Sequence, residues 1–121
     1  MLEQTLIGKR VLVVEDDPLA ALDYCDWLCE VGAEVIGPVA SVRQALSVLE
    51  TTKIDAGVID YALADANSAG LQVALEKRRI PFVVVTGYPR PLVRRYSTQI
   101  ILPKPINGDA LRSSVRELCV D

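Results

Sequence analysis

The chain alternates short apolar runs with stretches of helical periodicity, and this alternation restricts the fold more than any other feature of the sequence. Each apolar run ends at a polar residue or a turn signal, as is typical of strands in a sheet that is covered on both faces. The runs predict five strands, over residues Arg10–Glu15, Ala33–Val39, Ile54–Asp60, Pro81–Thr86 and Gln99–Leu102.

Helical patterns occupy the segments between the strands. They predict helices over Leu19–Val31, from an N-cap at Ser41 to Leu49, over Leu71–Arg79, over the short segment Leu92–Tyr96, and from Asn107 or Asp109 through Leu118. Apolar strands separated by helices form a parallel sheet with helices on both faces. We therefore expect one α/β domain with a doubly wound, five-stranded parallel sheet of the flavodoxin type, in strand order 2-1-3-4-5.

Local signals predict where some of these elements begin and end. Asp17 is expected to cap the first helix, with Pro18 in its first turn and Gly32 as its C-terminal stop. The pair Gly37-Pro38 is expected to break the second strand.

The composition excludes several classes of chemistry. The sequence contains no histidine, which excludes histidine metal ligands, Ser-His-Asp triads and histidine phosphocarriers. Its 13 Lys and Arg residues against 16 Asp and Glu residues give a net charge of −3, which disfavours direct binding to nucleic acid. The first apolar run is too short for a secretory signal or a membrane span, so a cytoplasmic location away from the membrane is expected. The three cysteines lack the paired spacing of zinc sites.

Polar residues mark the ends of four predicted strands. Glu15 and Asp16 follow the first strand, and Asp60 ends the third. Thr86 ends the fourth strand, and Lys104 follows the fifth. Since functional groups of a doubly wound sheet gather beyond the carboxyl ends of its strands, we expect these five residues on one rim. Three carboxylates at close quarters repel one another unless a cation is bound, and oxygen ligands select Mg²⁺ or Mn²⁺.

The turn after the first strand excludes the nucleotide-binding versions of this fold. Those proteins place a glycine-rich loop there, so that backbone amides approach the phosphates. Here residues 15–18 read Glu-Asp-Asp-Pro, and their negative charge would repel a phosphate unless a metal ion intervened.

These motifs, in this order and spacing, resemble the receiver domain of bacterial two-component response regulators. The matching pieces are Val11–Pro18, Ile59-Asp60, Val83–Gly87 and Lys104-Pro105. The similarity covers essentially the whole chain, so residues 1–121 are expected to form a single receiver domain without an output domain. The resemblance implies a cytosolic signalling protein rather than an enzyme, with self-phosphorylation and self-dephosphorylation as its only reactions.

The resemblance also implies roles for the residues on the rim. Asp60 would accept a phosphoryl group from a histidine of a sensor kinase or a histidine phosphotransfer protein. Thr86 would donate a hydrogen bond to the phosphoryl oxygen, and Lys104 would neutralise its charge. The peptide bond between Lys104 and Pro105 is typically cis in this family.

A Mg²⁺ ion is the cofactor that the resemblance implies. Asp16 would bind it directly, and Glu15 would bind it through water. Asp60 and the backbone carbonyl of Ala62 would supply two further ligands.

The segment after Thr86 departs from the ordinary receiver pattern. Only 18 residues separate Thr86 from Lys104, which predicts a shortened fourth helix. This spacing is similar to stand-alone receivers of alphaproteobacteria with a Phe-Ala-Thr-Gly-x-Tyr motif, although Val84-Val85 and Pro89 replace its aromatic and alanine residues. Ile101 stands where a switch aromatic is common, so we expect the readout to pass through the segment Pro89–Tyr96.

Two alternatives to a phosphorylated receiver remain. A pseudo-receiver would dock a partner constitutively and never carry phosphate. A phosphohydrolase with an aspartyl nucleophile is disfavoured, because such enzymes place an Asp-x-Asp motif on the first strand, where this chain has Glu15-Asp16-Asp17. If the chain is a receiver, the sequence leaves open whether it acts as a phosphate sink, a relay or a regulator of a kinase. It also leaves open whether the protein forms a homodimer. Ala62 and Tyr88 stand two residues after Asp60 and two after Thr86, at positions that influence how water reaches the acyl phosphate in this family, and they predict a long-lived phosphoaspartate.

Overall fold

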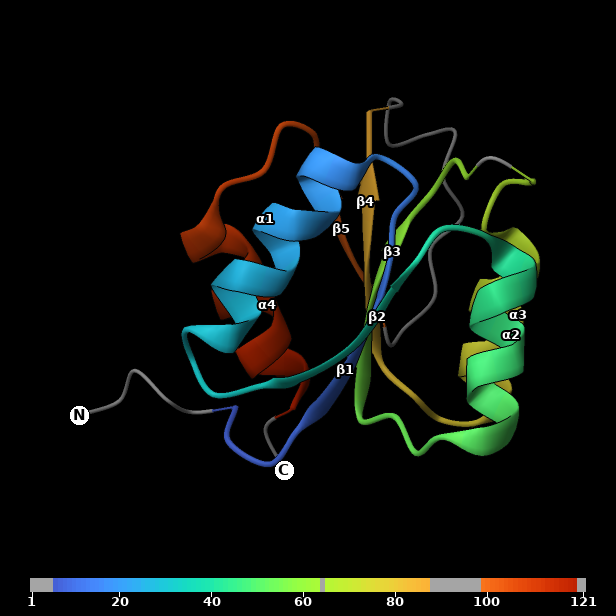
Figure 1. Cartoon of the computed structure of the whole chain (residues 1–121), viewed down its shortest axis with the longest axis horizontal. Coiled ribbons are helices and arrows are strands. Elements are labelled where there is room, and N and C mark those ends of the chain that lie inside the picture. The colour runs from blue at the N-terminus through green and yellow to red at the C-terminus, as the bar shows by residue number, and fades with distance from the viewer. Residues whose placement is uncertain (1–5, 64, 88–98, 120–121) are drawn as a thin grey trace.

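The sheet has the predicted strand order. The computed structural model describes residues 6–63, 65–87 and 99–119. Its five strands are all parallel and lie in the order β2-β1-β3-β4-β5 (Figure 1). Their bounds are β1 Arg10–Val14, β2 Glu34–Val39, β3 Ala56–Asp60, β4 Phe82–Thr86 and β5 Gln99–Pro103. The strands β2 and β5 therefore form the two edges of the sheet.

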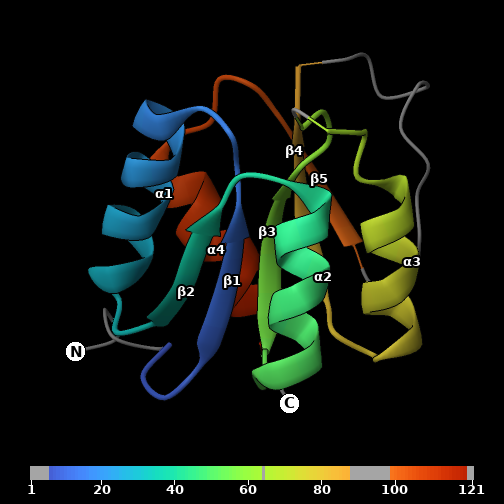
Figure 2. The ribbon, with the colours of Figure 1, turned by 45° about the vertical axis from the view of Figure 1, so that its right-hand side comes forward.

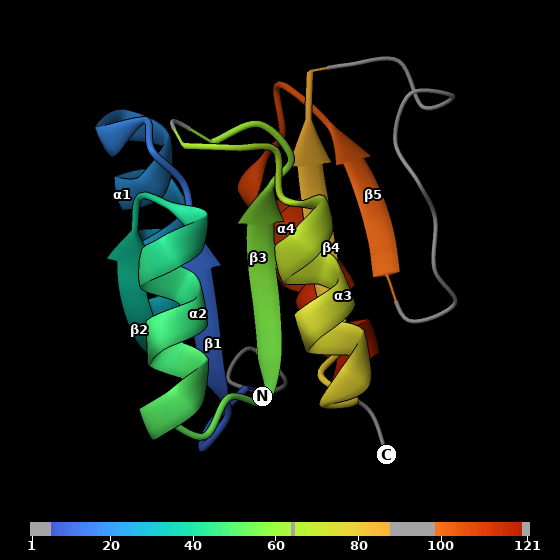
Figure 3. The ribbon, with the colours of Figure 1, turned by 90° about the vertical axis from the view of Figure 1, so that its right-hand side faces the viewer.

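Helices cover both faces of the sheet, as expected for parallel strands joined by helical crossovers. The helices α1 and α4 lie on one face, and α2 and α3 lie on the other (Figures 1 and 2). In Figure 3, α2 and α3 lie in front of the sheet and α1 lies behind it. The helix bounds are α1 Pro18–Cys29, α2 Val42–Thr51, α3 Ala69–Lys77 and α4 Gly108–Leu118.

Two apolar clusters, one on each face, form the core. The central strands β3 and β4 are buried along their whole length, and so is β1 from Val11 to Val14. Alternate strand residues point to opposite faces, so that Val11 and Val13 join the cluster beneath α1 and α4. Leu12 and Val14 join the cluster beneath α2 and α3.

The predicted helix caps are confirmed. Asp17 Oδ1 accepts a hydrogen bond from the Leu19 amide at 3.1 Å, with Pro18 in the first turn of α1. Ser41 Oγ accepts one from the Gln44 amide at 3.1 Å at the start of α2. Asn107, rather than Asp109, caps α4.

The second strand is continuous through Gly37-Pro38, contrary to the predicted break. Gly37 has φ +105°, and the following peptide bond is cis. The pairing of β1 with β2 shifts register between Leu12 and Val14, so the sheet absorbs the irregularity as a bulge. A proline is tolerated here because β2 is an edge strand, whose outer side pairs with no other strand.

Two helices end in a similar left-handed turn. After α1, Gly32 has φ +91°, and a Cβ atom there would lie 2.6 Å from Cγ1 of Ile7. The helix α3 ends at Lys77 and not at Arg79 as predicted, because Arg79 has φ +58°. The amide of Ile80 then donates to the Leu75 carbonyl at 3.0 Å, which closes the turn.

Some predictions fall outside the described residues. These are the short helical segment Leu92–Tyr96, and with it the shortened fourth helix, the readout segment Pro89–Tyr96, and Tyr88. Among the helices that the structure describes, none has the length and apolar character needed to cross a membrane.

Candidate functional site

The carboxyl ends of the strands bring the predicted rim residues to one end of the sheet. Asp60 is the last residue of β3 and pairs with Val85 of β4. Thr86 ends β4, and its carbonyl accepts a hydrogen bond at 2.8 Å from the amide of Lys104. The parallel register therefore fixes Lys104 beside the neighbouring strand end.

Three carboxylates meet at this end of the sheet. Glu15, Asp16 and Asp60 each offer one oxygen atom, and these three atoms lie within 4.8 Å of one another. Glu15 is 3% exposed and Asp60 is 5% exposed. Buried carboxylates this close together carry a strong electrostatic penalty unless positive charge is supplied.

Lys104 supplies part of that charge. Its Nζ atom lies 3.3 Å from Oδ1 of Asp60 and 3.5 Å from Oε1 of Glu15. One ammonium thus faces two buried carboxylates, while Asp16 makes no ion pair with any residue that the structure describes. We call Glu15, Asp16, Asp60 and Lys104 the acidic cluster.

One oxygen of the acidic cluster is left without a hydrogen bond. The Asp17 amide donates to Oε2 of Glu15 at 3.1 Å, which orients the carboxylate. Oε1 of Glu15 is buried and accepts no hydrogen bond from the described part of the chain. Within the described residues this buried oxygen has only the ion pair with Lys104, and its place beside two other carboxylates fits a hard divalent cation or one of its waters.

The titration behaviour follows from the same geometry. Burial raises the pKa of the Asp60 carboxyl above its ordinary value, although the charge of Lys104 opposes this shift. Burial also raises the pKa of the Glu15 carboxyl. Burial alone would lower the pKa of Lys104, but the charges of Asp60 and Glu15 raise it above its ordinary value. The lysine therefore remains charged at neutral pH.

The sequence analysis did not single out Tyr24, which lies beside this cluster. Burial raises the pKa of its hydroxyl, and the negative charges of Glu15 and Asp60 raise it further. Tyr24 lies seven residues after the N-cap Asp17, on the same face of α1. That helical spacing is the signal that could have identified it.

The roles predicted for Thr86 and Ala62 remain predictions. Thr86 is buried at the end of β4, one strand away from Asp60. Ala62 is exposed two residues after Asp60, in the loop before α3, and forms an isolated antiparallel bridge with Asn67.

Asp65 anchors the loop that follows the acceptor strand, and the sequence analysis missed it as well. Its Oδ1 accepts a hydrogen bond from the Val42 amide at 3.0 Å. Its Oδ2 accepts one from the Arg43 amide at 3.3 Å. These are the first two amides of α2, which Ser41 does not satisfy, so two residues of different loops cap one helix.

An open cavity adjoins the acidic cluster and gives access to it. It has a volume of about 500 Å³ and lies between α1 and β2. Glu15 and Asp16 line one part of it, and Leu22, Cys25 and Val35 give it an apolar wall.

Comparisons with known proteins show what the chain is similar to. The crystal structure of the response regulator PhyR from Brucella abortus has a TM-score of 0.82 and 26% identity, covering 97% of this chain and 50% of that chain. The solution structure of SdrG from Sphingomonas melonis Fr1 has a TM-score of 0.72 and 33% identity, covering 93% of this chain and 97% of SdrG. The transcriptional regulatory protein PdtaR of Mycobacterium tuberculosis is 33% identical over 92 residues, which are 74% of this chain and 44% of PdtaR.

The chain thus spans less than half the length of PdtaR and half the length of the PhyR chain. No family model matches the chain.

Proposed function

The chain belongs to the receiver family of response regulators, and from this membership we propose that it accepts a phosphoryl group on Asp60. The observation that carries the proposal is the acidic cluster, in which Asp60 lies beside two further carboxylates and the ammonium of Lys104. The donor would be a phosphohistidine on a sensor kinase or a histidine phosphotransfer protein, because this chain has no histidine of its own. The modified protein would then change its protein contacts within a cytoplasmic phosphorelay.

The transfer step is a substitution at phosphorus. An oxygen of the Asp60 carboxylate forms a bond to phosphorus as the bond between phosphorus and the donor's imidazole nitrogen breaks. The bonding electrons remain on that nitrogen. The product is an acyl phosphate on Asp60 and a neutral imidazole on the donor.

The acidic cluster fits a Mg²⁺ ion, as the unsatisfied oxygen of Glu15 indicates. Glu15, Asp16 and Asp60 would hold the ion, with the Ala62 carbonyl as a further ligand. When bound, Mg²⁺ neutralises charge on the transferring group and orients its oxygens.

The remaining residues would act on the phosphoryl group itself. Lys104 already faces the Asp60 carboxylate and would pair with a phosphoryl oxygen. Thr86 ends the adjacent strand, from which its hydroxyl would donate a hydrogen bond to another phosphoryl oxygen.

Intact-mass measurement after incubation with acetyl phosphate and Mg²⁺ tests the proposal. We expect one phosphoryl adduct on the wild type and on Asp26→Asn, which changes an exposed carboxylate of α1. We expect none on Asp60→Asn and none when EDTA removes the metal. If the folded wild type stays unlabelled both with acetyl phosphate and with a phosphorylated kinase, Asp60 is not an acceptor.

A phosphorylation-independent docking module is the second candidate. The departures at Val84-Val85 and Ile101 favour it, because the aromatic and small residues of the family's switch are absent there. Partner binding that is the same for wild type and Asp60→Asn, with and without phosphodonor, would support this second function.

A further inference from the structure

The acidic residues of the chain are concentrated in one segment. Residues 15–30 contain six acidic residues and no basic one, whereas the whole chain has 16 acidic and 13 basic residues. This segment comprises the turn after β1, the helix α1 and its C-cap. Its acidic residues are Glu15, Asp16, Asp17, Asp23, Asp26 and Glu30. The segment therefore carries a charge of −6 in a chain whose net charge is only −3.

Asp17 stabilises α1 as its N-cap, but the carboxylates further along the helix do not. Acidic residues near the C-terminus of a helix interact unfavourably with its dipole. Glu30 is compensated by Arg112 of α4, at 3.0 Å. Asp23 and Asp26 are exposed and form no ion pair within the described residues. Exposed and uncompensated carboxylates on one helix indicate a surface that meets a cationic partner.

A cavity of about 440 Å³ lies along one side of this helix, between α1 and the loop that joins β5 to α4. We call it the α1 cavity. Asp17, Asp23, Tyr24 and Trp27 line it from the side of α1, and Lys104 and Ile106 line it from the loop.

The lining combines two chemical features that suit a planar cation. The first is aromatic, since the half-buried ring of Trp27 borders the cavity and rests on the buried ring of Tyr24, with centroids 6.0 Å apart and planes inclined at 37°. The second is negative, since Asp23 is exposed without an ion pair among the described residues and Asp17 meets only the Leu19 amide that it caps. The ammonium of Lys104 is directed to Asp60 and Glu15 and leaves this charge in place.

We propose that the α1 cavity binds an arginine side chain of a partner protein. A guanidinium stacks on aromatic rings and pairs with carboxylates in its own plane, which an ammonium does less well. Leu19, which is 76% exposed on the same helix, gives the rest of the partner an apolar contact. The proposal goes beyond phosphoryl transfer, and it does not require Asp60 to be modified.

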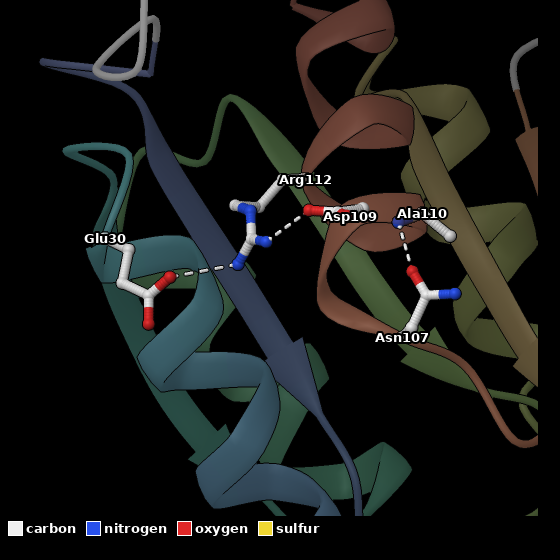
Figure 4. Close-up of polar contacts among 5 residues, drawn as sticks. All are labelled: Glu30, Asn107, Asp109, Ala110 and Arg112. Atoms are coloured by element: carbon white, nitrogen blue, oxygen red, sulfur yellow. Dashed lines mark hydrogen bonds and ion pairs between the residues drawn. The ribbon is translucent and has the colours of Figure 1, made fainter.

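Ion pairs and a hydrogen bond fix the elements that border the α1 cavity in the free protein. Arg112 lies between Glu30 at the end of α1 and Asp109 of α4, at 3.0 and 2.7 Å (Figure 4). Asn107, which follows the cavity residue Ile106, accepts a hydrogen bond from the Ala110 amide at 2.8 Å in the same view. These contacts fix the loop to both helices, which lowers the cost of binding.

The close approach of α4 to Trp27 adds to this preorganisation. A Cβ atom at Gly108 would lie 3.0 Å from Cγ of the Trp27 ring, so the first turn of α4 packs directly on the indole. The indole therefore cannot turn toward α4, and it stays in the wall of the cavity.

Trp27 is the only tryptophan in the chain, so its fluorescence reports on the α1 cavity directly. We would titrate the metal-free protein with N-acetylarginine amide and, separately, with the corresponding citrulline amide, which is neutral and similar in shape. We expect a saturable change with the arginine compound, with a Kd on the order of 1 mM for a ligand of this size. We expect no saturation with the citrulline compound.

Two matched variants test whether arginine binds in the α1 cavity or is attracted only by the negative charge of the helix as a whole. Asp23→Asn removes a carboxylate that lines the cavity, and the affinity should fall roughly tenfold. Asp26→Asn removes the same charge from the same helix outside the cavity, and the affinity should stay close to that of wild type. The titration uses no phosphodonor and no metal, so that a failure of the proposed phosphorylation is read separately.

Three results would overturn the proposal. They are no saturable change up to about a hundred times the expected Kd, equal responses to arginine and citrulline amides, and equal losses in Asp23→Asn and Asp26→Asn. The last result would show that the helix attracts cations only through its net charge.

Discussion

The ammonium of Lys104 lies 3.3 Å from Oδ1 of Asp60 although Asp60 ends β3 and Lys104 directly follows β5, two strands that are not neighbours. The strand β4 lies between them, and the amide of Lys104 is bound to the carbonyl of Thr86 at the end of that strand. The lysine thus reaches across one strand to the proposed acceptor, while its own backbone is held by the sheet.

Replacing Lys104 by methionine should slow phosphorylation while leaving the fold intact. The variant keeps the length of the side chain but removes the only cation that faces Asp60 in the described residues. We expect the initial rate of labelling by acetyl phosphate to fall about 10²-fold, the typical loss for one stabilising group at a transferring centre. Lys53→Met, at an exposed position before β3, is the matched control. An unchanged rate in Lys104→Met would remove this lysine from the mechanism.

Mg²⁺ should stabilise the wild type and not Asp16→Asn. A ligand that binds only the folded state adds about 1.4 kcal/mol to the free energy of unfolding at ten times its Kd. Asp16 contributes one of the three clustered oxygens, so its loss should abolish most of this effect. Urea unfolding with Mg²⁺ or with EDTA measures it, and Asp26→Asn should respond as the wild type does. Equal stabilisation of Asp16→Asn would place the ion elsewhere.

The metal-free protein should become more stable as the pH falls from neutrality toward the ordinary carboxyl pKa. Burial raises the pKa of Asp60 and Glu15, so in this window the folded state binds more protons than the unfolded state. The stabilisation that comes from protonating these two carboxyls is fully present below the ordinary carboxyl pKa. It is lost as the pH rises through their raised pKa.

Asp60→Asn provides the test of that pH dependence. At neutral pH it should exceed the wild type in free energy of unfolding by about 1–3 kcal/mol, the usual desolvation cost of a buried polar group, because it removes one of three clustered carboxylates that share the ammonium of Lys104. The difference should shrink as the pH falls toward the ordinary carboxyl pKa, as measured by urea unfolding in EDTA. A wild type whose stability is unaffected by pH in this range would contradict the assigned direction.

Arg79→Gly should stabilise the protein by about 1 kcal/mol, because a left-handed backbone penalises a side chain and favours glycine. Arg79 has φ +58° at the end of α3, where the turn after α1 has glycine. Thermal or urea unfolding measures the change. Arg78→Gly is the control and should destabilise, because Arg78 has φ −90° and pairs with Glu50 at 3.2 Å. A loss of stability in Arg79→Gly would show that its side chain matters more than its backbone strain.

Asp65→Ala should loosen the loop after β3 and the first turn of α2 together. The amides of Val42 and Arg43 would lose their acceptor, so their hydrogen exchange should accelerate while amides in the middle of α2 stay protected. These two hydrogen bonds lower the pKa of Asp65. The cap should therefore persist at and above the ordinary carboxyl pKa and be lost as the pH falls through the lowered value. Unchanged exchange at Val42 would mean that water replaces the carboxylate without cost.

Much of the site was predictable from sequence because parallel strands place their carboxyl ends together. Glu15, Asp60 and Lys104 each follow an apolar run, so the sheet topology alone brings them to one rim. The alternation of apolar runs and helical patterns predicted a flavodoxin-type sheet and with it the strand order. Local side-chain chemistry predicted the caps at Asp17 and Ser41. Their proposed chemical roles were reached by resemblance, and the geometry alone does not assign them.

Other features depend on tertiary packing that no local pattern encodes. Tyr24 reads as an ordinary core residue of an amphipathic helix, and its place beside Glu15 depends on how α1 packs against the sheet. Asp65 lies in a loop and caps a helix more than twenty residues earlier in the chain. The pair Gly37-Pro38 predicted a break, but pairing with β1 maintains the strand around it.

The strand order also sets when the acidic cluster can form during synthesis. Ribosomes release the N-terminal part of a chain first. The strands β1, β2 and β3 can pair while β5 is still inside the ribosome, because none of their contacts with one another requires it. Such a nascent sheet already gathers Glu15 and Asp60, but it lacks Lys104 to balance them. The last strand therefore completes the charge balance as well as the sheet, and a ribosome-bound chain that ends before residue 104 should take up no phosphate.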